Sequence, residues 1–352
     1  MAGASIAAEL APHAKVLIVE AESTPGYHAT GRSAAFWEEC YGGPGVAPLT
    51  LASGKYLRQH DLLAPRGALY LGRAEDEAKI DAFMESFGGT GVHIDKLGRA
   101  SLEQRVAGLR PEWTLAIAEP ACADIDVAGL HQHYLSLARQ AGAELRTSCP
   151  LESAEREGEG WRLSFGQRGE AQAHVLVNAA GAWADEVAGL AGAKALGIGP
   201  LRRTVIQLRT DPPPPSDLPL VLDISGRFYF KPEHGRLWLS PHDETPSAPA
   251  DVAPEELDVA IAIDRFEQVV DWRVAAVERK WAGLRSFAPD RLPVYGFDAA
   301  RDGFFWFAGQ GGFGIQTAPA AARLGAQLLL GLARDEMTEA LDASLYSPER
   351  LA

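Results

Sequence analysis

The sequence is poor in cysteine, with three in 352 residues. Cys40, Cys122 and Cys149 lie far apart and form no C-x-x-C pair. An odd, scattered set of this kind is not the pattern of a disulfide framework or of a zinc site. We therefore expect no bound metal and a reducing, cytoplasmic location.

Long hydrophobic runs and an excess of positive charge are also lacking. Runs such as Leu328-Leu329-Leu330 are too short to span a bilayer, and Met1 leads into small residues without the basic start of a signal peptide. The net charge of -14 is spread along the chain, which argues against nucleic acid or an anionic membrane as a partner. The 47% apolar fraction is ordinary for a globular protein of one large domain or two.

The sharpest local pattern is an apolar run at residues 304–308 that changes into the glycine-rich turn 309–314. A helix is predicted for residues 318–330, because Pro319 is acceptable in a first helical turn. A strand, a glycine loop and a helix aim free N–H groups at an electron-rich ligand. A tight turn without a ligand is the alternative.

The N-terminal residues resemble half of a nucleotide-binding unit. Residues 3–10 are predicted to be a helix, and residues 15–20 a buried strand that ends in Glu20, where an acid accepts hydrogen bonds from a ribose. The sequence starts at what would be the last fingerprint glycine, Gly3, so we expect the first strand to be missing and the true start codon to lie upstream. An ordinary α/β strand that ends in Glu is an equal alternative.

Two further loops follow predicted strands. Residues 24–35 are rich in Gly, Ser and Thr and contain Arg32, a composition that suits a pyrophosphate or a plain surface loop. Residues 175–177 lead into small residues and then a helix with Asp185, which is typical of either a ligand-binding sheet edge or close packing. Asp126 is predicted to cap a helix over residues 127–141.

Residues 199–287 contain short alternating runs rich in aromatic residues, a pattern that predicts an antiparallel insert. Arg203 and Arg285 lie on apolar strands within it, and a buried guanidinium needs an anionic partner. That partner is either an internal acid or, with Tyr41 and Tyr229 converging, a substrate carboxylate that accepts paired donors.

Four motifs in this order, at residues 25–35, 178–183, 281–287 and 310–317, resemble the D-amino-acid oxidase family of flavoproteins, and within it the D-arginine dehydrogenase type. The resemblance covers nearly the whole chain from Gly3. It implies an α/β (α+β) two-domain fold, with a Rossmann-like FAD-binding domain and an antiparallel-sheet substrate domain. The FAD domain would comprise residues 1–75, 125–200 and 290–352, and the substrate domain residues 76–124 and 201–289.

The resemblance also implies the cofactor site. Glu20 would hold the adenosine ribose, Leu151 would meet the adenine, and the loop from Ala29 to Phe36 would wrap the pyrophosphate and isoalloxazine. The turn before the last helix would place N–H groups near the flavin carbonyls. The full set is Gly3, Glu20, Ala29, Thr30, Gly31, Arg32, Ser33, Ala34, Ala35, Phe36, Leu151, Gly181, Gly311, Gly312, Phe313, Gly314, Ile315, Gln316 and Thr317.

The implied reaction is oxidative deamination of a D-amino acid, as in amino-acid catabolism. The residues that match the carboxylate-binding positions are Tyr41, Arg203, Tyr229 and Arg285, whereas Gly312 and Gln316 line the reacting end. Hydride transfer from Cα to flavin N5 needs orientation, so no general base is nominated. The imino acid then hydrolyses to a 2-oxo acid and ammonia. The electron acceptor (quinone, carrier or oxygen) and the oligomeric state stay open.

Two other functions remain alternatives: oxidation of glycine, sarcosine or another secondary amine, and a truncated, inactive chain that holds no flavin. The side-chain preference is also divided. Ala68 stands where arginine-preferring relatives carry an acid, and Leu220 and Leu222 are apolar, which favours neutral D-amino acids. Glu38 replaces a small polar residue and favours cationic ones. We expect the neutral class, with Glu38 facing water, because an unpaired buried Glu38 is costly.

Overall fold

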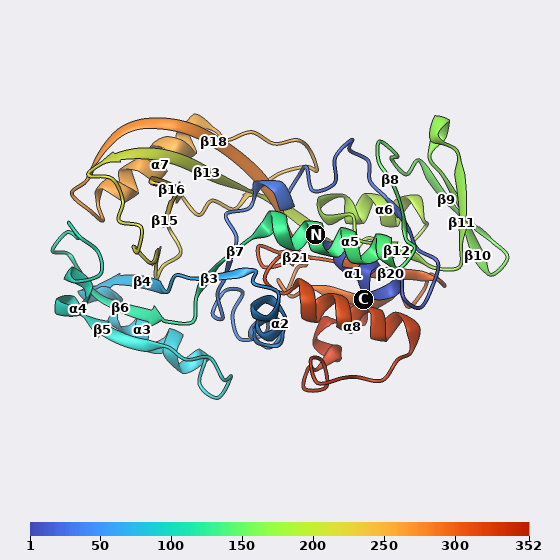
Figure 1. Cartoon of the computed structure of the whole chain (residues 1–352), viewed down its shortest axis with the longest axis horizontal. Helices are drawn as coiled ribbons and strands as arrows, with labels where there is room; N and C mark the ends of the chain where they lie inside the picture. The colour runs from blue at the N-terminus through green and yellow to red at the C-terminus, as the bar shows by residue number, and fades with distance from the viewer. Residues whose placement is uncertain (352) are drawn as a thin grey trace.

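The computed structural model describes residues 1–351, so Ala352, the last residue of the predicted FAD domain, lies outside the described residues. The chain forms two lobes (Figure 1). One is built on a large sheet whose strands carry Arg203 and Arg285, and the other on short parallel strands flanked by helices. The predicted two-part α/β architecture is therefore confirmed.

The large sheet has ten strands and is antiparallel except for the parallel pair β4 and β14. Its strand order is β21 (Gln310–Gly311), β18 (Arg273–Phe287), β13 (Gly199–Asp211), β16 (Arg236–Ser240), β15 (Tyr229–Glu233), β14 (Leu220–Asp223), β4 (Ala68–Arg73), β6 (Trp113–Glu119) and β5 (Asp95–Gly98), and β17 (Thr245–Pro246) pairs with β13. The predicted domain division ends the first FAD segment at residue 75, yet β4 belongs to this sheet. We therefore propose a boundary before Ala68.

Side chains alternate between the two faces of the sheet. Leu69 and Val221 lie in a core covered by helix α7 (Glu256–Glu267), which buries Phe266 there. The helices α3 (Glu77–Ser86) and α4 (Arg99–Glu103) flank β5 and β6 (Figure 1). The opposite face carries Ala68 and Leu220 and packs against residues of the segment 34–47. That face therefore looks toward the other lobe.

The second lobe contains several small sheets. The parallel strands form two of them: β1 (Leu17–Val19) with β8 (Glu144–Arg146), and β12 (Leu176–Asn178) with β20 (Phe304–Ala308), which also pairs with β19 (Val294–Phe297). Within residues 1–351, β1 and β12 each have a partner on one edge only. Two antiparallel sheets complete the set: β9 (Ser153–Glu157), β10 (Gly160–Ser164) and β11 (Glu170–Ala173); and β2 (Phe36–Trp37), β7 (Ala123–Ile125) and β3 (Leu63–Pro65).

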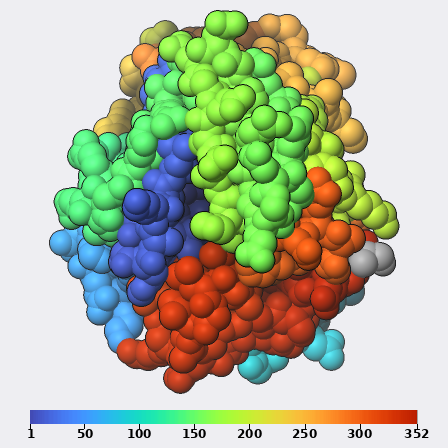
Figure 2. Space-filling model, turned by 90° about the vertical axis from the view of Figure 1, so that its right-hand side faces the viewer, coloured from blue at the N-terminus to red at the C-terminus, as the bar shows by residue number. Residues whose placement is uncertain are grey.

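The helices of this lobe are α1 (Ala2–Leu10), α2 (Ala47–Gln59), α5 (Val127–Gln140), α6 (Ala184–Leu190) and α8 (Ala318–Leu330). Helix α5 begins as predicted, because the Asp126 carboxylate accepts the N–H of Gly129 at 2.8 Å. Its buried residues Leu130, Tyr134 and Ala138 recur every fourth position, so one face packs inward. Figure 2 shows the N-terminal residues (blue) between the C-terminal residues (red) and the middle of the chain (green).

Candidate active site

Arg203 and Arg285 lie side by side on two neighbouring antiparallel strands. Arg203 on β13 is opposite Gly283 on β18, and Arg285 is opposite Leu201. Because side chains alternate along a strand, this two-residue offset places both guanidinium groups on the same face. The side chain of Arg203 is 7% exposed and that of Arg285 is 12% exposed. Two cations are thus held together in a largely buried position.

An internal acid partly neutralises these arginines. Glu244 Oε1 accepts a hydrogen bond from Arg285 Nη2 at 2.9 Å and lies 3.5 Å from Arg203 Nη2. Arg203 Nε donates to the backbone carbonyl of Asp243 at 2.8 Å. The internal ion pair that the sequence left open is therefore present. Even so, Arg203 Nη2 and Arg285 Nε are buried and find no hydrogen-bond acceptor in residues 1–351. Both guanidinium groups keep unused donors.

Two tyrosines complete this cluster. The hydroxyl of Tyr41 accepts a hydrogen bond from Arg285 Nη1, and the Tyr229 ring centre lies 5.9 Å from the guanidinium carbon of Arg203. Burial raises the pKa of Tyr41 to about 12 and also raises the pKa of Tyr229, against the opposing charge of Arg203. Both residues stay neutral phenols at physiological pH. The ring of Phe36 lies between them, 6.2 Å from Tyr41 and 5.8 Å from Tyr229.

Gly312 lies directly against this cluster. A Cβ atom at residue 312 would overlap the hydroxyl of Tyr41 and would stand 2.5 Å from Arg285 Nη1. Only glycine therefore allows the turn after β21 to approach the tyrosine and the arginine so closely. The structure thus brings together five of the six residues predicted to act on the substrate, namely Tyr41, Arg203, Tyr229, Arg285 and Gly312.

Gln316, the sixth, is engaged by the protein itself. Its Oε1 accepts the N–H of Glu38 at 3.1 Å, and its Nε2 donates to the carbonyl of Glu38 at 3.0 Å and to Thr50 Oγ1 at 2.9 Å. Because the side chain is 1% exposed, all of its polar groups are satisfied internally. Gln316 holds the backbone of the segment that carries Tyr41.

Glu38 does not face water, so that expectation was wrong. Its side chain is fully buried, and neither carboxyl oxygen has a hydrogen-bond partner among residues 1–351. Glu119, at the end of β6, is also buried and accepts the N–H groups of Glu39 at 2.7 Å and Cys40 at 3.3 Å. Burial, and then the charge of Glu119, raises the pKa of Glu38 well above its usual range. Burial thus favours the uncharged form of the Glu38 carboxyl over its carboxylate.

Two acids in this region, Glu119 and Glu244, were not predicted from the sequence. Glu119 directly follows the continuous apolar run of residues 115–118, and a short apolar run of this kind is a usable sign of a buried strand. Glu244 lies in a polar loop between β16 and β17 and has no such signal. A neighbour in the same loop, His242, is kept uncharged because burial, and then Arg203, lowers its pKa to about 3.

The predicted cofactor loop lies at the start of α1. The Met1 amino group donates to Thr30 Oγ1 at 2.8 Å, and burial lowers the pKa of that amino group to about 6. A Cβ atom on Gly31 would stand 2.6 Å from the carbonyl oxygen of Gly26, so the loop requires glycine there. The first turn of α1 has no side-chain cap and no acidic residue, which leaves its N–H groups available to an anion.

Arg32 has a different environment from the one its loop predicts. Its guanidinium binds Asp251 Oδ1 at 2.5 Å and the carbonyls of Ala282 at 3.2 Å and Val252 at 3.3 Å. The indole N–H of Trp281 donates to the Arg32 carbonyl at 2.9 Å. Because Asp251 balances its charge, Arg32 joins the loop to the lobe of the large sheet and is not a free cation.

The glycine turn before α8 also offers donors. Strand β20 and helix α8 occupy residues 304–308 and 318–330, as predicted. The N–H groups of Gly314, Ile315 and Gln316 find no protein acceptor in residues 1–351. At the end of β12, Gly181 has a φ of +57°, while Leu151 packs partly buried in the neighbouring core. Gly181 thus follows the carboxyl end of a strand, and residues 314–316 lie just before a helix start.

The match to known families agrees with this geometry. A family model described as FAD dependent oxidoreductase, DAO, matches residues 1–328. The chain belongs to the DAO family. Glycine oxidase of Pseudomonas aeruginosa is 30% identical over 224 residues, which are 60% of this chain and 58% of that protein. Across the curated relatives compared first, the aligned part spans only 34%, 43% and 58% of their lengths.

Solved structures of similar fold cover nearly the whole chain. The glycine oxidase of Geobacillus kaustophilus has a TM-score of 0.82 at 24% identity and covers 98% of this chain and 95% of its own. The L-proline dehydrogenase of P. horikoshii has a TM-score of 0.84 at 21% identity, with 99% and 94% covered. At these identities the likeness supports the DAO fold alone.

FAD is the cofactor of this family, and two features of the chain fit it. The uncapped start of α1 suits phosphate oxygens, and the unpaired N–H groups of residues 314–316 suit the carbonyl oxygens of a flavin ring. In the described residues no helix is long and apolar enough to cross a membrane. No group of three or more His, Cys, Asp or Glu side chains within residues 1–351 is placed to hold a metal ion.

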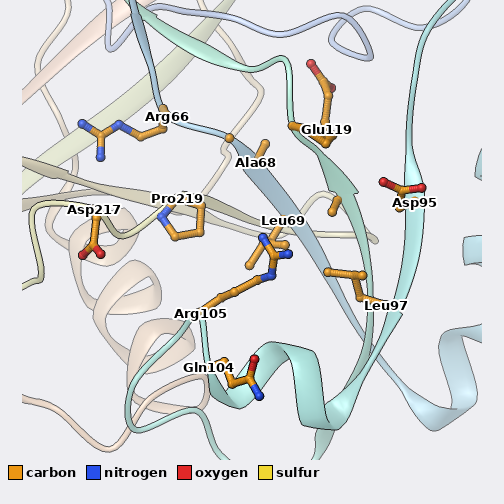
Figure 3. Close-up of a pocket in the computed structure, with 13 residues that line it drawn as sticks. Arg66, Ala68, Leu69, Asp95, Leu97, Gln104, Arg105, Glu119, Asp217 and Pro219 are labelled. Carbon is orange, nitrogen blue, oxygen red and sulfur yellow. The ribbon is translucent and has the colours of Figure 1, made fainter.

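A separate cavity of about 260 Å³ lies at the edge of the large sheet. Leu69, Leu97, Arg105 and Glu119 are among the residues that line it (Figure 3). Its lining includes both Ala68 and Leu69, which are neighbours on β4. We assign no ligand to it.

Proposed function

We propose that this protein catalyses the FAD-dependent oxidative deamination of D-amino acids with neutral side chains. The observation that carries the proposal is the convergence of Arg203, Arg285, Tyr41 and Tyr229 beside Gly312. Two fixed guanidinium groups with unused donors and two neutral phenols are suited to one carboxylate. A D-amino acid supplies that carboxylate together with an oxidisable Cα–H bond.

The protein's contribution is orientation. The paired arginines would hold the substrate carboxylate on one side of Gly312, and the phenol of Tyr41, which already accepts from Arg285, keeps its own O–H proton to donate. When bound, FAD supplies the hydride acceptor, held by Glu20, the loop 29–36 and the turn 312–317. A carboxylate fixed at two points directs the Cα–H bond without an acid or base, so no general base is proposed.

The wall of the site favours neutral side chains. Ala68 pairs with Leu220 and Tyr70 with Leu222 across β4 and β14, so these four residues present one apolar face. Glu38 belongs to the segment that carries Tyr41, and the raised pKa of its buried carboxyl favours the uncharged form, which suits a neutral partner better than a cation. D-Leucine and D-methionine are therefore expected to be better substrates than D-arginine.

The experiment is anaerobic flavin reduction by a panel of substrates. Purified protein is expected to be yellow, and D-leucine or D-methionine is expected to bleach its flavin bands faster than D-arginine. Protein that is folded but colourless would support the flavin-free alternative. A strong preference for D-arginine that Glu38→Ala abolishes would contradict the neutral class. Re-oxidation of the reduced protein by oxygen or by a quinone then separates an oxidase from a dehydrogenase.

The second candidate is oxidation of glycine, sarcosine or another secondary amine. The similarity to glycine oxidase favours it, and the same carboxylate site would serve it. Bleaching by glycine or sarcosine at lower concentrations than by D-leucine would replace the first proposal with this one.

A further inference from the structure

One carboxylate oxygen of Glu244 is shared by three guanidinium groups. Its Oε1 accepts from Arg285 Nη2 at 2.9 Å and from Arg291 Nη2 at 2.8 Å, and it lies 3.5 Å from Arg203 Nη2. Glu244 comes from the loop between β16 and β17, whereas Arg203 and Arg285 come from β13 and β18. A short loop thus places an anion where two strands hold cations.

The two strand arginines are buried, whereas Glu244 and Arg291 are partly exposed. The side chains of Arg203 and Arg285 are 7% and 12% exposed, but that of Glu244 is 36% exposed and that of Arg291 is 52% exposed. A Glu244 carboxylate that leaves the two buried arginines gains solvation, because it moves toward water, and Arg291 remains available to it as an exposed partner. The Glu244–Arg291 pair, whose side chains are 36% and 52% exposed, contributes little to stability by itself.

The other acid of this loop does not take the same place. The carboxylate of Asp243 accepts the N–H of Thr204 at 2.7 Å and its hydroxyl at 3.0 Å. Asp243 Oδ1 stands 3.8 Å from Arg203 Nε, and its Oδ2 stands 4.0 Å from Arg202 Nε. Asp243 is fixed to the backbone of β13, so Glu244 is the acid that a ligand carboxylate meets.

We propose that Glu244 is an internal counter-ion that competes with the substrate carboxylate for Arg203 and Arg285. A bound carboxylate displaces it toward Arg291 and water. Glu244 thereby sets how tightly the site binds carboxylates, whereas the chemical step proceeds without it. This inference rests on the proposed function, because it requires the arginine pair to be the carboxylate site.

The test uses the flavin-loaded protein and 4-methylpentanoate, which is leucine without its amino group. Calorimetry gives its Kd for the wild type and for Glu244→Gln, a change that removes the charge and keeps the size. We expect the variant to bind at least about tenfold more tightly, and the KM for D-leucine to fall while kcat changes less than about twofold, because only the competing charge is lost. Glu336→Gln, which removes an exposed partner of Lys55, is the matched control and is expected to leave the Kd unchanged.

A second variant changes the exposed partner of Glu244 and is expected to have the opposite effect on affinity. Arg291→Gln removes the partner that receives the displaced Glu244, so the Kd for 4-methylpentanoate is expected to rise by about threefold or more. An unchanged or weaker affinity in Glu244→Gln, or an unchanged or tighter one in Arg291→Gln, overturns the inference. A third outcome also overturns the inference: Glu244→Gln binds D-leucine more weakly than the wild type does, while its affinity for 4-methylpentanoate is not weakened. Glu244 would then hold the substrate ammonium.

Failure of the inference differs from failure of the proposed function. If D-leucine reduces the flavin but the two affinities for 4-methylpentanoate are equal, only the role of Glu244 is wrong. If 4-methylpentanoate binds neither the wild type nor Glu244→Gln, although both are folded and yellow, the arginine pair is not a carboxylate site and both proposals fall.

Discussion

The side-chain amide of Gln316 binds both backbone groups of Glu38. It accepts the Glu38 N–H at 3.1 Å and donates to the Glu38 carbonyl at 3.0 Å, across a sequence separation of 278 residues. The side-chain amide thus makes the same two hydrogen bonds to Glu38 that the backbone of a neighbouring β-strand would make. It joins the turn before α8 to the segment that presents Tyr41, so the two halves of the candidate site hold a fixed relation.

Gln316→Leu is expected to destabilise the fold by about 2–4 kcal/mol, because it leaves buried backbone groups of residue 38 and the hydroxyl of Thr50 unpaired. Urea unfolding measures the change. Gln132→Leu, on the exposed side of α5, is the matched control and is expected to stay within about 0.5 kcal/mol of the wild type. Equal decreases in the free energy of unfolding in the two variants would mean that the hydrogen bonds of the Gln316 side chain do not stabilise the fold.

Glu38→Gln is expected to stabilise the protein more at pH 8 than at pH 5. A buried acid with a raised pKa keeps its proton in the folded state, while the unfolded chain ionises above about pH 4.3. Wild-type stability from this group is therefore present at low pH and is lost as pH rises toward the folded pKa. A neutral amide has no such loss, and the difference is expected to reach about 1–3 kcal/mol at pH 8.

Urea unfolding of both proteins at the two pH values checks this, with the exposed Glu112→Gln as the control. A gain in stability that is the same at pH 5 and pH 8 would show that Glu38 is ionised in the folded protein.

Gly312→Ala is expected to disturb the site and leave the fold largely intact. The new methyl group would overlap the Tyr41 hydroxyl and press on Arg285, whereas the same change at Gly189 in α6 meets no atom within 4 Å. We expect flavin reduction by D-leucine to slow by about 100-fold or more in Gly312→Ala, since small displacements of a positioned substrate have effects of this size. Gly189→Ala is expected to match the wild type. Comparable rates in the two variants would place the reacting end elsewhere.

Local patterns predicted the helices and strands because their signals lie within a few residues. The Asp126 cap fixed the start of α5, and the apolar run with its glycine turn fixed β20 and α8. The apolar residues that flank Arg203 and Arg285 likewise indicated that their guanidinium groups are buried. Each of these signals is carried by neighbours in sequence.

Pairings between remote segments were not predictable in the same way. Glu244 meets its three arginines only because the loop after β16 folds over two other strands, and the sequence around it reads as an ordinary polar loop. Glu38 was expected to face water, since its burial depends on Gln316 and Glu119, which lie 278 and 81 positions away in the sequence. Arg32 likewise found Asp251 across the interface between the lobes.

Anaerobic flavin reduction in the wild type and in Arg285→Met decides whether the arginine pair orients a carboxylate beside the flavin. D-Leucine is expected to bleach the wild-type flavin and L-leucine to leave it oxidised. In Arg285→Met, the D-leucine concentration that gives half the maximal rate is expected to rise by about 100-fold or more, because one of two buried guanidinium groups is lost. Unchanged reduction of the Arg285→Met flavin by D-leucine would contradict the proposed site.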